Sequence, residues 1–195
     1  DKYPEFQAAD DKSAIDWSKK IGKKIWMWNY INAYGSKIPP GVPAISTKCI
    51  ASYYKRMAPH MFGAYVQSDT DYALFHYLNY YVIHKLFWNN DTDVDALVNE
   101  YQQKLFGPAA GPMGVFFARL EDIWMNQLLG EFKSTARGPV MVKHTEVEVW
   151  EQVYTDEVFG QLEALYDEAE KLARNDPDSL TRVRWFRKHF LGKML

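Results

Sequence analysis

The sequence predicts an α/β fold that is mostly helical. Two runs rich in β-branched and aromatic residues, IWMWNY and HMFGAYVQSD, are separated by roughly 30 residues that contain one helical pattern. This spacing is typical of a β-α-β unit, so the two strands should be parallel and joined by a crossover helix. After the second run, apolar residues recur at helical spacing almost to the end of the chain.

The first strand, residues 24–30, follows a short amphipathic helix. That helix is predicted over residues 11–22, where Gly22 can end it and apolar side chains recur three and four positions apart, at Ala14, Trp17 and Ile21. The stretch YGSKIPPGVP after the strand is rich in Gly and Pro and predicts a long loop. Residues 47–57 then predict the crossover helix.

The second strand, residues 60–69, alternates so that its side chains divide between two faces. One face would carry Met61, Gly63, Tyr65 and Gln67, and the other Phe62, Ala64 and Val66.

The rest of the chain is predicted to be helical, with one break. Helical patterns cover residues 71–88, 92–107, 112–129, 155–174 and 180–191. Thr92 with Asp95 resembles a capping box at the start of the second of these helices. Residues 131–143 lack a period, so they are predicted to form a loop.

Composition argues against several classes of function. The formal net charge is -2 and the pI is about 6.2, so we expect no nucleic-acid partner. No apolar run reaches the roughly 18 residues that a membrane span needs. The single cysteine, Cys49, rules out internal disulfides. Because the chain begins DKYPEF, without an initiator methionine, we expect a mature product or a fragment.

No motif for a metal or a cofactor stands out. The histidines lack the spacing of a metal-ligand set, and neither a phosphate-binding glycine motif nor a nucleophile elbow follows a strand. We therefore expect no metal site and no cofactor.

Polar side chains stand at the carboxyl ends of both predicted strands, where ligand sites form in parallel sheets. Sugars present an apolar ring face and a rim of hydroxyls, so aromatic rings mixed with amide and carboxylate groups suit a glycan. We therefore expect the substrate-binding residues to be Trp28, Asn29, Tyr30, Gln67 and Asp69.

These assignments have structural alternatives. The tryptophans can fill the core, and Asp69 can cap the helix that follows it. A glycoside hydrolase needs two carboxyl groups about 5 to 9.5 Å apart, whereas Asp71 and Asp91 are explained as helix caps. The catalytic residues therefore stay unassigned.

Several motifs occur in a familiar order: a strand ending WNY, the loop IPPGVP, a strand running into QSD, and the segments 85–97 and 101–110. Together they resemble the carboxyl-terminal part of the bacterial family called domain of unknown function 4838, over roughly residues 17–124. That family is similar to barrel glycoside hydrolases, among them α-glucuronidases and β-hexosaminidases. It occurs in secreted or periplasmic proteins of glycan-degrading bacteria.

The resemblance implies a fold and a function. Residues 1–130 would be the last strands and helices of a glycoside-hydrolase-like (β/α)8 TIM-type barrel, and residues 131–195 a helical carboxyl-terminal extension. The substrate would be an oligosaccharide or polysaccharide fragment, and the location secreted or periplasmic. The alternative is a non-catalytic carbohydrate-binding or purely structural helical module.

Two departures from the family pattern qualify these expectations. Where the family usually has an acid, as in W-D-Y, this chain has Asn29, which can hydrogen-bond but cannot act as an acid. A complete barrel takes about 250 residues, so two strands leave an open edge. Either the missing remainder of the barrel or a second chain would complete it, and we expect glycoside hydrolase activity only from the full barrel.

Overall fold

The computed structural model describes residues 3–32, 41–68, 73–130, 132–136, 138–142 and 144–194. The chain forms two compact units. The first comprises Asp1–Ser36 and Ser46–Leu97, and the second comprises Lys37–Ile45 and Val98–Leu195.

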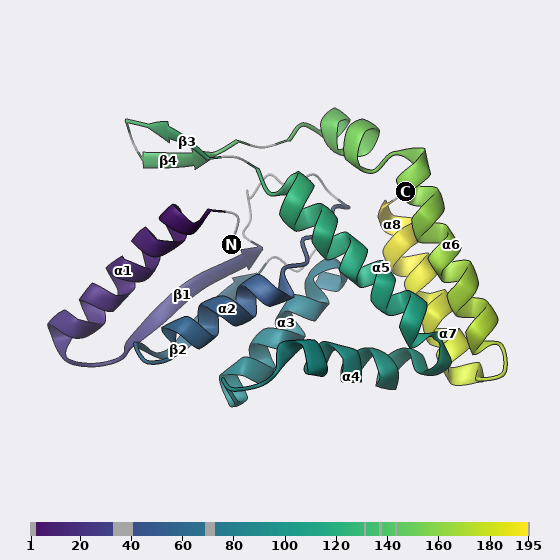
Figure 1. Ribbon diagram of the computed structural model, residues 1–195, viewed down its shortest axis with the longest axis horizontal. Helices are drawn as coiled ribbons and strands as arrows, with labels where there is room; N and C mark the ends of the chain where they lie inside the picture. The colour runs from purple at the N-terminus through teal and green to yellow at the C-terminus, as the bar shows by residue number, and fades with distance from the viewer. Residues whose placement is uncertain are drawn as a thin grey trace. The chain divides into compact units, whose positions relative to one another are not determined.

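The first unit is built on a two-stranded parallel sheet. β1 (Ile25–Asn32) pairs with β2 (Met61–Ser68), and α2 (Thr47–Met57) comes between them in the chain (Figure 1). Parallel strands need a crossover connection, and α2 belongs to it. The predicted β-α-β unit is therefore confirmed, including the common direction of its strands. In the described part of the chain, this sheet is not closed into a barrel.

Helices cover the side of the sheet on which Asn29 lies. The Asn29 amide donates a hydrogen bond to the hydroxyl of Tyr54 on α2, which is buried. α3 (Ala73–Trp88) packs on α2, with the Phe87 ring centroid 5.0 Å from that of Tyr54. α1 (Pro4–Ile21) is joined to α2 by an ion pair between Asp11 and Arg56.

The structure corrects the predicted limits and packing of α1. The helix begins at Pro4, whose fixed φ suits a first helical position, and it ends at Gly22 as expected, with φ of 65°. Ala14 is buried as predicted, but Trp17 and Ile21 are exposed. The buried stripe of α1 instead contains Asp11 and Ser18, so apolar spacing misplaced it.

The capping box predicted at Thr92 and Asp95, at the start of α4 (Val94–Phe106), is also wrong. α4 is capped by Asp93, whose Oδ1 accepts a hydrogen bond of 3.1 Å from the Ala96 amide. The Thr92 hydroxyl donates instead to the Asn89 carbonyl oxygen, at 2.6 Å. A carboxylate at this position caps the helix as well as a hydroxyl does.

The second unit is helical. It contains the end of α4, α5 (Ala110–Ile123), α6 (Asp156–Ala173), α7 (Pro177–Phe186) and α8 (Gly192–Met194). π-helical turns occupy Trp124–Leu128, Glu148–Val153 and Arg187–Leu191. The core is a cluster of contacting rings, Phe106, Phe116, Phe117, Tyr166, Phe186 and Phe190.

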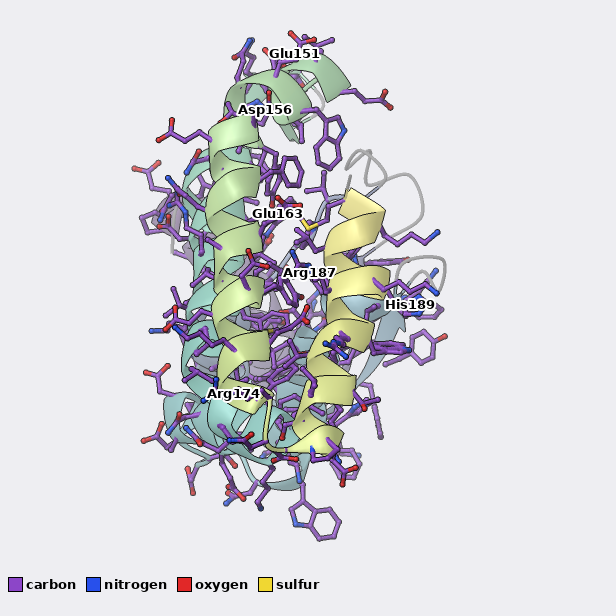
Figure 2. The ribbon with its side chains drawn as sticks, turned by 90° about the vertical axis from the view of Figure 1, so that its right-hand side faces the viewer. Glu151, Asp156, Glu163, Arg174, Arg187 and His189 are labelled. Atoms are coloured by element: carbon purple, nitrogen blue, oxygen red, sulfur yellow. The ribbon has the colours of Figure 1, made fainter. Side chains whose placement is uncertain are left out.

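Figure 2 shows α6 beside the carboxyl-terminal helical segment, with Arg187 between them. The guanidinium of Arg187 binds Asp167 at 2.7 Å and Glu170 at 3.1 Å, so an ion pair accompanies the apolar contact of these helices.

The loop predicted over residues 131–143 contains a hairpin. β3 (Phe132–Thr135) pairs with β4 (Gly138–Met141) in an antiparallel arrangement. Each strand has four residues, and β3 is largely exposed, so no apolar alternation marks it in the sequence. Gly138 adopts φ of 103° beside the turn, which favours glycine.

The ion pair between α1 and α2 can be tested by substitution. Asp11→Ala should lower the free energy of unfolding by about 1–3 kcal/mol, because it removes a charged partner from Arg56. Urea denaturation followed by circular dichroism measures this loss. Asp10→Ala, on the exposed side of the same helix, is the matched control. An equal effect of both substitutions would contradict the role given to Asp11.

Candidate functional site

Five aromatic rings lie exposed on the sheet face that the helices leave bare. Trp26, Trp28, Tyr30, Phe62 and Tyr65 are each more than half exposed to solvent. We name these five residues the aromatic face. Large apolar groups that gather at a surface mark interaction sites more often than scattered ones do.

The rings of the aromatic face form two contacting groups, one around Trp28 and one between Trp26 and Phe62. Trp28 is paired with Tyr65 across the strands, and their ring centroids are 4.8 Å apart in an edge-on arrangement. Trp28 and Tyr30 follow at 6.5 Å, and Trp26 lies 5.2 Å from Phe62. These contacts restrict the rotamers of side chains that are otherwise exposed to water.

A register shift places Phe62 on this face, so its predicted assignment to the opposite face is wrong. Ile25 pairs with Met61 but Trp26 pairs with Gly63, which leaves Phe62 as an extra residue on β2. Gly63 then makes room for the ring of Trp26. A Cβ atom at Gly63 would lie 2.7 Å from Cζ3 of that ring.

The predicted substrate-binding residues divide between the two faces of the sheet. Trp28 and Tyr30 belong to the aromatic face, and Gln67 joins them because its Oε1 accepts a hydrogen bond of 3.1 Å from the Trp28 indole N–H. Asn29 points the other way, toward Tyr54. Asp69 lies outside the described residues.

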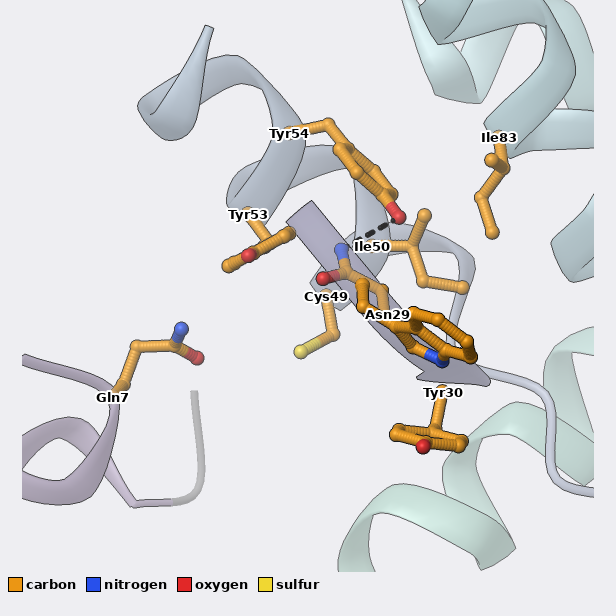
Figure 3. Close-up of a pocket in the computed structure, with 9 residues that line it drawn as sticks. Gln7, Asn29, Tyr30, Cys49, Ile50, Tyr53, Tyr54 and Ile83 are labelled. Atoms are coloured by element: carbon orange, nitrogen blue, oxygen red, sulfur yellow. Dashed lines mark hydrogen bonds between the residues drawn. The ribbon is translucent and has the colours of Figure 1, made fainter. Parts of the chain in front are cut away.

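A cavity of about 390 Å³ lies beside β1 (Figure 3). β1 contributes Trp28, Asn29 and Tyr30, and α2 contributes Cys49, Ile50, Tyr53 and Tyr54. Gln7 of α1 and Ile83 of α3 complete the described lining. Two of the lining residues, Trp28 and Tyr30, also belong to the aromatic face. We name this cavity the edge cavity.

Asn29 is the central polar group of the edge cavity. Its Nδ2 donates to the Tyr54 hydroxyl at 2.9 Å (Figure 3). Burial raises the pKa of Tyr54, and the hydrogen bond from Asn29 opposes this increase without cancelling it. Burial likewise raises the pKa of Tyr53, with an opposing interaction from Asn29 and an additional increase from Asp11. Both hydroxyls therefore keep their protons at neutral pH.

Sequence reasoning missed six described residues of the edge cavity, namely Gln7, Cys49, Ile50, Tyr53, Tyr54 and Ile83. The adjacent tyrosines were a usable signal, because two large rings with hydroxyls on a crossover helix must find polar partners when buried. Gln7 gave no such signal, since the predicted helix began only at residue 11.

The described residues form neither a metal-binding cluster nor a membrane-spanning helix. No group of three or more His, Cys, Asp or Glu side chains is placed to hold a metal ion there. Within the same residues, no helix is both long and apolar enough to cross a membrane.

The raised pKa of Tyr54 predicts a specific alkaline weakness. A folded-state pKa above the unfolded value of about 10 stabilises the protein below that pH, and this contribution is lost as the pH rises. Tyr54→Phe should therefore lose less stability than the wild type between about pH 7 and about pH 11. Urea denaturation at both pH values measures the difference.

Ile50→Val is the control for this experiment, because it alters the same cavity without removing an ionising group. It should keep the alkaline loss of the wild type. The same loss in Tyr54→Phe would show that this hydroxyl titrates like an exposed tyrosine.

Comparison with known proteins gives one match. No curated protein and no solved structure matches the chain significantly. The sequence of residues 5–117 matches the family described as Domain of unknown function (DUF4838), over more than half of the chain. This match includes the whole β-α-β unit with the aromatic face and the edge cavity. The chain belongs to the family described as Domain of unknown function (DUF4838).

Proposed function

We propose that this chain is the glycan-contacting part of a barrel-type, glycoside-hydrolase-like protein that acts on oligosaccharides or polysaccharide fragments. The observation that carries the proposal is the aromatic face, five exposed rings in two contacting groups, of which Trp28 and Tyr30 also line the polar edge cavity. Successive sugar residues of a glycan can stack their C–H groups on these side chains, because each aromatic ring offers a flat apolar surface.

Polar groups accompany the rings, as a sugar requires. Gln67 uses its Oε1 on the Trp28 indole, which holds the indole in place and leaves the amide NH2 group to donate. Tyr30 and Tyr65 add hydroxyls to the exposed rings. A ligand that presents only an apolar surface would make no use of these groups.

The arrangement of the first unit supports a place in a barrel wall. Parallel strands with helices on one side and a bare face on the other correspond to the wall of a (β/α)8 barrel, whose ligand site lies at the carboxyl ends of the strands, where Tyr30 is paired with Gln67. The remainder of the barrel, or a second chain, would then complete the sheet beside β1 and β2. The proposed location is secreted or periplasmic, where a polymeric glycan is accessible.

A second candidate is a non-catalytic carbohydrate-binding module. It is favoured by the composition of the site, because the described residues of the aromatic face and the edge cavity include no carboxylate. Release of reducing ends from soluble polysaccharides separates the candidates. Hydrolysis by the full barrel protein supports the enzyme, and retention of glycans without hydrolysis supports the module.

The central ring of the aromatic face provides the test of binding. Trp28→Ala should weaken binding of soluble polysaccharides in affinity electrophoresis at least about tenfold, equivalent to about 1.4 kcal/mol. The substitution removes the ring that contacts both Tyr30 and Tyr65.

Trp88→Ala is the matched control for this prediction, because Trp88 is the most exposed large apolar residue in the described part of the chain and lies at the end of α3, outside the aromatic face. Equal retention of the wild type and both variants, across glucans, xylans and mannans, would refute the proposed function.

A further inference from the structure

We propose that the edge cavity holds one uncharged sugar residue of the glycan, and that it rejects a residue that carries a carboxylate. This inference rests on the proposed function and adds the chemical class of the sugar. It follows from the size of the cavity, its hydrogen-bonding groups and the charge of its walls.

The size of the edge cavity suits one ring of a glycan. Its volume of about 390 Å³ lies near the lower end of the range of ligand pockets, about 300–1,000 Å³. Trp28 and Tyr30 belong both to the cavity and to the aromatic face. A chain that lies along the rings therefore reaches the cavity without crossing an apolar gap.

The edge cavity offers both hydrogen-bond donors and hydrogen-bond acceptors. The Nδ2 of Asn29 donates to Tyr54, so the Asn29 Oδ1 is left to accept and the Tyr54 O–H to donate. Gln7 donates from Nε2 to Asp11 at 3.2 Å, which leaves its Oε1 as an acceptor. Sugar hydroxyls both donate and accept, and this mixture satisfies them.

The described walls of the edge cavity contain no cationic side chain to balance a negative charge. They consist of amides, hydroxyls, a thiol and apolar groups, with no acidic or basic side chain among them. Of the charged side chains that act on Tyr53, Asp11 and Arg56 form an ion pair, and Asp10 adds a further negative charge. A carboxylate moved into this site would lose part of its hydration without gaining a cation from the described walls.

Binding measured by calorimetry on the full chain tests the inference. The neutral probes are β-1,4-linked tetrasaccharides of glucose, xylose, mannose and N-acetylglucosamine, and the acidic probe is tetragalacturonate. We expect at least one neutral probe to bind at least about tenfold more tightly than tetragalacturonate, a difference of about 1.4 kcal/mol. Tyr54→Phe should weaken that binding about fivefold, because it removes one donor.

Three variants separate the possible outcomes. Tyr53→Phe provides a second hydroxyl deletion in the cavity in case Tyr54→Phe does not fold. Tyr81→Phe removes a hydroxyl outside the cavity, keeps the ring that faces Lys85, and should bind as the wild type does. Trp26→Ala alters the aromatic face without touching the described lining of the cavity.

The outcomes distinguish this inference from the proposed function. Weaker binding in both cavity variants, with a preference for a neutral probe, supports the inference. If Trp26→Ala weakens binding but the cavity variants do not, or if tetragalacturonate binds as well as the neutral probes, the inference is overturned while the proposed function stands. If no probe binds, both fail.

Discussion

The parallel pairing of β1 with β2 determines the organisation of the first unit. Parallel strands need a crossover, and α2 provides it on the side of Asn29 and Tyr54. α1 and α3 then gather on α2 through the Asp11–Arg56 ion pair and the contact between Tyr54 and Phe87. The opposite side of the sheet keeps its rings in solvent, although parallel sheets are normally covered on both faces.

The edge cavity shows how closely the site depends on that packing. Tyr54 fills the space between the sheet and α3, and its hydroxyl also fixes the orientation of the Asn29 amide. α1 brings Gln7 to the cavity through the same segment that carries Asp11. A substitution meant to alter ligand binding here therefore also alters the contact between helices and sheet, so controls at neighbouring positions are needed.

Elements with a regular apolar pattern were predictable from the sequence, and elements held by polar contacts were not. The bounds of α2 and the direction of the two strands followed from periodicity and spacing. α1 did not, because its buried stripe includes Asp11 and Ser18, and the β3–β4 hairpin did not, because its short strands bury no apolar face. In the site, Trp28, Asn29 and Tyr30 were expected to contact one ligand together, whereas the structure directs Asn29 to the opposite face from its two neighbours. The alternation predicted for the second strand failed at Phe62, because a register shift adds one residue to β2.

That register shift also affects the shape of the aromatic face. Irregular pairing occurs at both ends of the ladder, between Ile25 and Trp26 and again between Tyr30 and Asn32. Such irregularities increase the local right-handed twist of strands. Contacting rings of the aromatic face are tilted by 35° to 60° relative to one another. A single rigid plane can therefore lie flat against only some of the five rings at once.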